Sequence, residues 1–188
     1  MFKCFLLKDN EKVKKILIKM RKVVFVTAPK DFRDEEYYKP KKVLEKEGIE
    51  VITASLKVGE LEGRFGYKAI STYTIQDIGL NDFDAIAYIG GNGSSIFFDD
   101  LNALRLAKSF CKCEKPIASI CIAGVILANA GILKGKKATV FSDGKEFLTK
   151  GGAIYTGIPL EIDGNIITAN GPEVAEDFGR AIVKVLGD

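Results

Sequence analysis

The sequence predicts an α/β fold, a three-layer sandwich in which helices flank a mostly parallel central sheet. Short runs of apolar, largely β-branched residues alternate along the chain with segments of helical periodicity, an order typical of parallel sheets. A length of 188 residues suits a single hydrophobic core. Apolar residues make up 47% and charged residues 28% of the chain, as in ordinary globular proteins. We therefore expect one folded domain.

The first half of this domain contains the start of the predicted sheet. Lys22 to Ala28 is a run rich in β-branched residues that ends at Pro29, as in a buried parallel strand. Helical periodicity from Asp34 to Gly48 predicts a helix that stops at its glycine. Glu50 to Ala54 follows as a strand and completes a βαβ unit, and the alternating stretch from Leu61 to Thr74 predicts a pair of short strands.

The middle of the chain contains two further buried strands. Phe83 to Ile89 runs into the loop Gly90-Gly91-Asn92-Gly93, after which Ser94 or Ser95 is expected to cap a helix that ends near Phe110. Pro116 to Ile120 is the second strand. It is followed by a helix from Ile122 to Ala130 that stops near Gly131.

The last third alternates between short elements. Strands are expected near Ala138 to Phe141, Ala153 to Thr156 and Asn165 to Ala169, with a short helix from Lys145 to Lys150. A closing helix from Pro172 to Leu186 begins with proline in a favourable first position.

Residues 1–21 form an extension before the domain of residues 22–188. Their apolar residues recur at helical spacing opposite several lysines, which predicts a short amphipathic helix, either packed on the domain or loose: Val13, Ile16, Leu17 and Met20. The alternative is that translation begins at Met20.

Composition argues against several classes of function. The net charge of +3 comes largely from lysines near the start, and no basic stripe with interleaved aromatics follows, so we expect no nucleic-acid partner. No apolar run approaches the roughly 20 residues that cross a bilayer, and no secretory signal is recognisable, so a cytoplasmic location without a membrane partner is expected. The four cysteines lack the spacing of a zinc site, and no metal or other cofactor is predicted: Cys4, Cys111, Cys113 and Cys121.

Cys121 is the main candidate for a reactive residue. It lies where a predicted strand turns into a predicted helix, the arrangement of a nucleophile elbow. Backbone N–H groups and the partial positive charge of a helix start stabilise a thiolate there. Apolar neighbours raise the thiol pKa instead, and the sequence leaves the balance open. A cysteine after a strand is also often only a small buried hydrophobic residue.

The loop Gly90-Gly91-Asn92 leaves the neighbouring strand at the same edge of the sheet, where open α/β sheets bind ligands. Its bare backbone suits the donation of an oxyanion hydrogen bond. The same glycines also fit a simple tight turn between strand and helix.

Residues 22–188 resemble the DJ-1/PfpI family of intracellular proteases, within the class I glutamine amidotransferase-like superfamily of flavodoxin-like folds. The matching blocks occur in order: EEYYKPKKVLEKEGIEV, GRFGYKAISTYTIQDI, FDAIAYIGGNG, KPIASICIAGVILANAGILKGKK and IDGNIITANGPEVAEDFGRAIVKVL. The resemblance implies that Cys121 is paired with a protonated glutamate, which falls on Glu36 with Pro40 in register behind it. Glu35 takes this role if the register shifts by one residue.

The chain departs from the family where histidine is usual. Protease-like members have SICHGP, whereas this chain has SICIAG with Ile122 after the cysteine, and the histidine of DJ-1-like members corresponds to Phe141. Because the chain contains no histidine, a Cys–His dyad is impossible within it. Acid–base work is left to Glu36, a water or Tyr155. Ile89 also replaces the proline that usually precedes the paired glycines.

These features give three expectations for function. The first is an enzyme acting on small reactive carbonyls, as in glyoxalases or deglycases, with Cys121 as nucleophile, Glu36 as proton carrier and the N–H groups of Gly91 and Ile122 as oxyanion donors. The second is a redox sensor or chaperone-like stress protein with an oxidisable Cys121. The third is a peptidase relative, and an inactive site is the remaining alternative. The substrate is an unidentified small molecule, and the resemblance implies a homo-oligomer.

Overall fold

The computed structural model describes residues 20–187, and the helix predicted in the extension therefore lies outside the described residues but for its last two positions. No helix among the described residues is long and apolar enough to cross a lipid bilayer.

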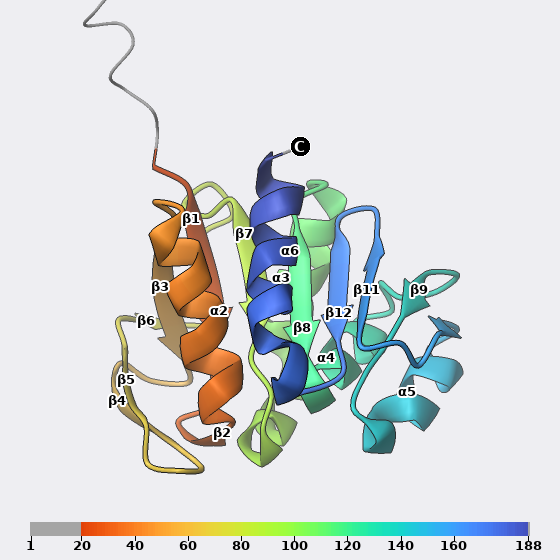
Figure 1. Ribbon diagram of the computed structural model, residues 1–188, viewed down its shortest axis with the longest axis horizontal. Coiled ribbons are helices and arrows are strands. Elements are labelled where there is room, and N and C mark those ends of the chain that lie inside the picture. The colour runs from red at the N-terminus through yellow and green to blue at the C-terminus, as the bar shows by residue number, and fades with distance from the viewer. Residues whose placement is uncertain (1–19, 188) are drawn as a thin grey trace, which may run out of the picture.

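A mostly parallel central sheet forms the middle layer and confirms the predicted fold class (Figure 1). Within residues 20–187 it has seven strands in the order β11-β12-β8-β7-β1-β3-β6. Strand β11 is antiparallel to its neighbour and the others pair in parallel, as expected when helices connect successive strands. The strands are β1 (Lys22–Val26), β3 (Glu50–Ser55), β6 (Tyr73–Thr74), β7 (Ala85–Tyr88), β8 (Ile117–Ile120), β11 (Leu160–Asp163) and β12 (Ile166–Ala169).

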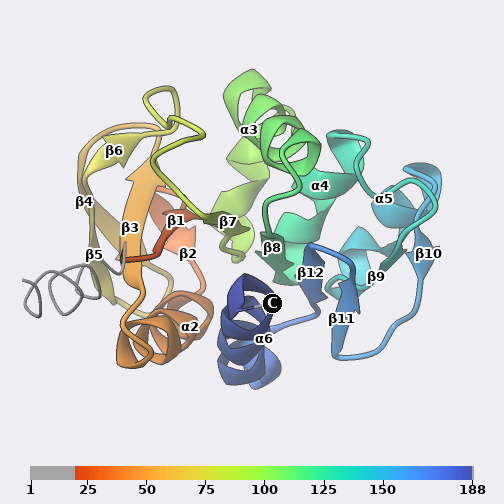
Figure 2. The same ribbon diagram turned by 90° about the horizontal axis from the view of Figure 1, so that it is seen from above.

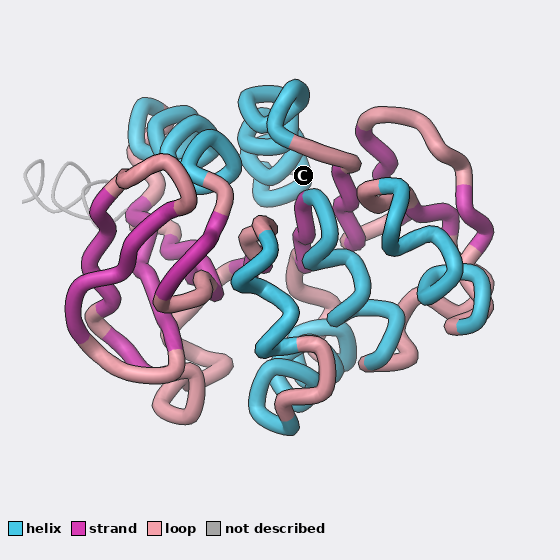
Figure 3. Tube along the Cα trace, turned by 90° about the horizontal axis from the view of Figure 1, so that it is seen from below, coloured by secondary structure: helices cyan, strands magenta, loops and turns pink. Residues whose placement is uncertain are grey.

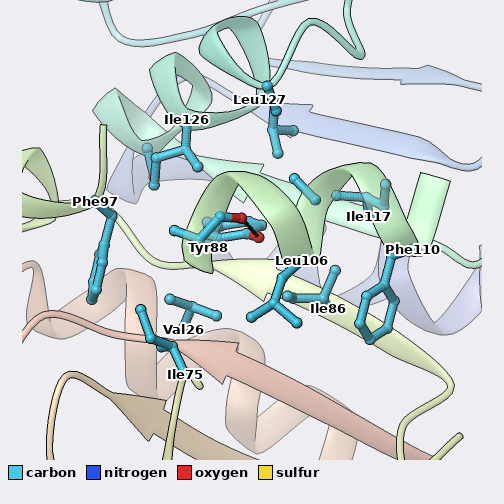
Figure 4. Packing of buried hydrophobic residues seen from close by; sticks show 14 of the residues in the cluster. Val26, Ile75, Ile86, Tyr88, Phe97, Leu106, Phe110, Ile117, Ile126 and Leu127 are labelled. Atoms are coloured by element: carbon cyan, nitrogen blue, oxygen red, sulfur yellow. Dashed lines mark hydrogen bonds between the residues drawn. The ribbon is translucent and has the colours of Figure 1, made fainter. Parts of the chain in front are cut away.

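Helices cover both faces of this sheet (Figure 2). One face carries α2 (Asp34–Lys46) and α6 (Ala175–Gly187), and the other carries α3 (Leu101–Lys112) and α4 (Gly124–Asn129). Each face has its own hydrophobic cluster, because the side chains of a buried strand alternate between the two layers. Figure 4 shows the cluster beneath α3 and α4, in which Leu106 and Ile126 pack near Tyr88.

A small three-stranded sheet stands beside the main one and contains the hairpin predicted between Leu61 and Thr74. Its strands are β2 (Lys30–Phe32), β4 (Gly59–Gly63) and β5 (Lys68–Ser71), with β4 and β5 antiparallel. Strand β2 was not predicted, because three residues after a proline show no periodicity. The hairpin turn at residues 64–67 extends toward the carboxyl ends of the central strands (Figure 1).

The prediction that Ser94 or Ser95 caps a helix reaching Phe110 was wrong. A separate 3-10 helix, η1 (Asn92–Phe97), comes first, and both serine hydroxyls donate to carbonyl groups within it or just before it. The helix α3 begins later, and Asp100 caps it by accepting hydrogen bonds of 2.9 Å from the backbone N–H groups of Asn102 and Ala103.

The last third matches the prediction in outline. Strands β9 (Lys137–Ala138) and β10 (Ile154–Tyr155) pair in a separate two-stranded sheet, which the sequence did not distinguish from the main one. Strand β11 was missed because its residues are only partly buried. The 3-10 segments η3 (Ser142–Gly144) and η4 (Pro172–Val174) precede α5 (Lys145–Lys150) and α6.

Candidate active site

Cys121 lies on a strained turn at the carboxyl end of β8. The strand ends at Ile120 in extended backbone, and Cys121 then has a φ of 59°, in the left-handed region that non-glycine residues seldom occupy. A 3-10 turn, η2 (Cys121–Ala123), leads directly into α4. Such backbone strain is retained where the surrounding structure requires it. This turn directs the side chain of Cys121 away from the carboxyl edge of the sheet.

Gly90 of the neighbouring loop makes room for the side chains of Cys121 and Glu36, and Gly91 makes room for the backbone of residues 31–33. A β-carbon on Gly90 would lie 2.4 Å from Glu36 Oε2 and 2.6 Å from the β-carbon of Cys121. Both groups therefore press against the bare backbone of this loop from different elements. Gly91 has a φ of 95°, and a β-carbon there would lie 2.3 Å from the backbone nitrogen of Arg33, so only glycine fits.

Glu36 is the fully buried acid of this site. It lies in the first turn of α2, and its side chain is 0% exposed. Neither carboxyl oxygen has a partner in full hydrogen-bond geometry among the described residues. Burial raises the pKa of Glu36 from 4.5 to about 8, against smaller lowering contributions from the side chains of Cys121 and Arg33. The carboxyl group is therefore largely protonated at neutral pH.

The Cys121 thiol is subject to opposing influences. Burial is the largest, and together with the charge of an ionised Glu36 it raises the thiol pKa to about 12. The backbone N–H groups of Gly91 and Ile122 donate toward the sulfur and lower the pKa, but by less. Burial therefore outweighs the backbone donors. At neutral pH Glu36 holds its proton, so repulsion between two negative charges is absent unless both groups ionise.

The thiol opens into a cavity of about 400 Å³ at the carboxyl edge of the sheet. Figure 3 views the molecule from this edge, where loops and short helices surround the strand ends. Apolar groups cover part of the wall, and charged groups of both signs line the rest. The lining residues are Arg33, Glu36, Arg64, Gly91, Asn92, Ser95, Phe98, Cys121, Ile122, Phe141, Asp143, Pro172 and Glu173.

The structure brings together the four residues that the sequence analysis singled out: Cys121, Glu36, Gly91 and Ile122. Phe141 also lines the cavity, at the position to which the resemblance assigns a histidine. Glu35 does not line it, and its carboxylate instead accepts from Arg33 Nε at 2.9 Å. The register of α2 thus favours Glu36.

Tyr155, the alternative proton carrier, does not reach the cavity. It lies in β10, packs against the core cluster under α3 and α4, and has the ammonium group of Lys145 5.5 Å from its ring centre. The sequence placed it on a strand but gave no sign that this strand belongs to a separate small sheet.

Four charged residues of the cavity were missed by the sequence analysis: Arg33, Arg64, Asp143 and Glu173. Arg64 lies in the turn between β4 and β5, Asp143 in η3 and Glu173 in η4. These three belong to a turn or to 3-10 segments, which have no periodicity to predict the direction of a side chain, and Arg33 is the residue directly before α2. The glycines that flank the Arg64 turn, Gly63 and Gly66, were the only available signal.

No group of three or more cysteine or acidic residues is arranged to hold a metal ion among residues 20–187. Cys111, Cys113 and Cys121 are free thiols.

Comparison with known proteins identifies the relatives of this fold. The model of the DJ-1/PfpI family matches residues 21–185. An uncharacterised protein of Methanocaldococcus jannaschii is 41% identical over 180 residues, which cover 94% of this chain and 88% of that protein. A deglycase of Pyrococcus horikoshii is 32% identical over 165 residues, covering 88% of this chain and 99% of the deglycase. A ThiJ/PfpI domain protein from Brachyspira murdochii superposes with a TM-score of 0.88 at 32% identity, over 90% of this chain and 98% of that structure.

Proposed function

The chain belongs to the DJ-1/PfpI family, and we propose that it acts on small reactive carbonyl compounds through the thiol of Cys121 and the carboxyl group of Glu36. Relatives of about 30% identity are named deglycases, which is consistent with this class of substrate. The observation that carries the proposal is the state of Glu36. It is fully buried beside the thiol, with a raised pKa and no other partner for either oxygen among the described residues.

A buried carboxyl group whose hydrogen-bonding neighbour is a thiol is costly, because both oxygens have lost water and a thiol is only a weak donor. Such a group is expected where its proton is needed for a reaction. In this site it supplies the acid–base function for which the chain has no histidine.

In the proposed first step the sulfur of Cys121 bonds to the aldehyde carbon while the π bond of the carbonyl breaks. The thiol proton passes to one oxygen of Glu36, and the proton on its other oxygen passes to the carbonyl oxygen. The product is a neutral hemithioacetal, and Glu36 ends the step protonated as it began. The N–H groups of Gly91 and Ile122 stabilise the negative charge that develops around the sulfur and the attached oxygen.

Completing the reaction needs only water. Conversion of a 2-oxoaldehyde into a 2-hydroxy acid adds one water molecule and moves one hydrogen from the aldehyde carbon to its neighbour. No external oxidant or reductant takes part. The cavity of about 400 Å³ is of a size for a small molecule and is too small for a folded protein substrate.

The test is turnover of methylglyoxal, followed by the appearance of lactate, in wild type and three variants. Cys121→Ser and Glu36→Gln are each expected to lose activity at least about 100-fold, the usual effect of removing a nucleophile or proton donor. Glu35→Gln is the matched control and is expected to stay within about threefold of wild type, because Glu35 lies outside the cavity. Absence of turnover in wild type, or full activity in Glu36→Gln, would contradict the proposal.

The redox-sensor alternative is less well supported by the site. Peroxide reacts with thiolate, and burial raises the pKa of the Cys121 thiol, which lowers the thiolate fraction. A rapid gain of oxygen mass confined to Cys121 at low peroxide would favour that alternative over carbonyl chemistry.

A further inference from the structure

One cation in the cavity wall has no role in the proposed chemistry. Arg64 lines the cavity, and its side chain makes no hydrogen bond or ion pair with any described residue. Arg64 donates a hydrogen bond only through its backbone N–H, to the carbonyl of Phe32 at 2.9 Å, among the described residues. All the donors of the Arg64 side chain are therefore available to a ligand.

Arg33 lies in the same wall and is partly available. Its Nε donates to Glu35 at 2.9 Å, and its guanidinium carbon lies 4.7 Å from the ring centre of Phe65. These two contacts fix the plane of the guanidinium group. They leave the two terminal nitrogens without a partner among the described residues.

The turn that carries Arg64 is held firmly against the start of α2. The buried carboxylate of Asp34 accepts hydrogen bonds from the backbone N–H groups of Phe65 at 3.0 Å and Tyr67 at 2.8 Å. Arg33 in turn is tied to the loop beside the thiol, because its backbone N–H donates to the carbonyl of Gly90 at 3.1 Å. The backbone segments that carry the two arginines are thus held in place relative to Cys121 before any ligand binds.

Besides Glu36 in α2, two further acids of the cavity come from elements other than those that carry the arginines. Asp143 precedes α5, which lies at the opposite side of the molecule from the β4–β5 hairpin (Figure 2), and Glu173 precedes α6. A bound anion is therefore attracted to the arginines and repelled by the acids, which gives it one orientation in the cavity.

From this arrangement we infer that the cavity binds carbonyl compounds that also carry a carboxylate, which pairs with Arg64 and the terminal nitrogens of Arg33 while the carbonyl carbon meets Cys121. This inference rests on the proposed function for the fate of the carbonyl. The recognition of the carboxylate depends on the arginines alone. A planar carboxylate matches the paired donors of a guanidinium group.

The experiment separates binding from chemistry by using Cys121→Ser, which cannot form a hemithioacetal. The probes are 4-oxopentanoate, a ketone with a carboxylate, and 2-pentanone, its neutral counterpart of the same chain length. Dissociation constants are measured by NMR titration in Cys121→Ser alone and combined with Arg64→Gln or with Lys57→Gln. Lys57 is an exposed cation outside the cavity and serves as the matched control.

We expect Cys121→Ser to bind 4-oxopentanoate at least about tenfold more tightly than 2-pentanone. Arg64→Gln should remove this preference, and Lys57→Gln should keep it. Equal affinities for the two probes, or a preference that survives Arg64→Gln, would overturn the inference. Because Arg64 is exposed, Arg64→Gln is expected to fold, and its circular dichroism spectrum checks this.

Turnover by the wild-type chain distinguishes the inference from the proposed function. The substrates are 4,5-dioxopentanoate, a 2-oxoaldehyde with a carboxylate, and neutral 2-oxopentanal. A higher kcat/KM for 4,5-dioxopentanoate supports both proposals. Equal turnover of the two aldehydes keeps the carbonyl chemistry and overturns the anion site. Arg64-dependent binding of 4-oxopentanoate without turnover of either aldehyde supports the anion site and overturns the carbonyl chemistry.

Discussion

Two buried carboxyl groups in the first turn of α2 differ in their hydrogen bonds. Asp34 accepts two backbone hydrogen bonds from the turn of the β4–β5 hairpin, whereas neither oxygen of Glu36, two residues later, has a partner among the described residues. A glycine lies against each carboxyl group. A β-carbon on Gly63 would lie 2.7 Å from the carboxyl group of Asp34, and a β-carbon on Gly90 would lie 2.4 Å from Glu36 Oε2. The first turn of α2 can therefore hold a buried acid with two hydrogen bonds, as it does for Asp34. Glu36 lies beside the Cys121 thiol without such backbone donors.

The largest expected effect concerns the stability of Glu36→Gln. The pKa of Glu36 is raised from 4.5 to about 8, so between these values the folded chain holds a proton that the unfolded chain has lost. Wild-type stability therefore falls as pH rises through this window, by up to about 4 kcal/mol at pH 8. Glu36→Gln lacks this loss and should be the more stable protein at pH 8. Urea unfolding of both proteins from pH 4.5 to 8 measures the difference, and parallel pH profiles would refute it.

Asp34→Asn should lower the free energy of unfolding, whereas Glu36→Gln should raise it at pH 8. An amide can accept at only one of its two positions, so one backbone N–H of the hairpin turn is left without its charged partner. We expect a loss of about 2–3 kcal/mol in the free energy of unfolding. Denaturant unfolding at pH 7 measures it. Asp31→Asn is the control and should change stability by less than about 0.5 kcal/mol, because Asp31 is exposed and asparagine tolerates its φ of 56°.

Substitution of either glycine by alanine tests the same comparison. Each substitution is expected to lower the free energy of unfolding by about 1–3 kcal/mol. Gly90→Ala forces a methyl group against Glu36 and against the backbone carbonyl of Ile120, at 2.6 Å, so it should displace the thiol and the carboxyl group and lower methylglyoxal turnover at least about tenfold. Gly63→Ala meets the Asp34 carboxyl group, so it should loosen the hairpin turn and leave turnover within about threefold of wild type. Turnover of methylglyoxal distinguishes the two variants, and an equal loss in both would contradict the separation of roles.

The smallest effect is expected for Tyr155→Phe. Because Tyr155 does not line the cavity, loss of its hydroxyl group should change methylglyoxal turnover by less than about twofold. A large loss of turnover would mean that the proton path extends beyond Glu36.

The order of strands and helices was predictable because it depends on apolar runs such as Val23–Val26 and on the helical periodicity before Gly48. The position of Cys121 was predictable for the same reason, since it follows the end of a buried strand. The partner in α2 came from the resemblance to the DJ-1/PfpI family, because one sequence does not show which of Glu35 and Glu36 turns inward.

The charged wall of the cavity could not be predicted. Arg64 reaches it because Asp34 holds a turn that lies 30 residues away along the chain, and no local pattern encodes that contact. The balance at the thiol was also beyond the sequence, because burial and backbone donors act on the pKa in opposite directions and only the folded structure gives their relative weight.

The central claim is that Glu36 keeps its proton at neutral pH and offers it to the reaction at Cys121. The most direct test is a ¹³C NMR titration of the Glu36 carboxyl carbon, assigned by its absence from Glu36→Gln. We expect a protonated carboxyl group at pH 6.5 and a midpoint near 8, because burial raises the pKa of Glu36 to about this value. A carboxylate already ionised at pH 6.5, with a midpoint near the ordinary value of 4.5, would contradict it.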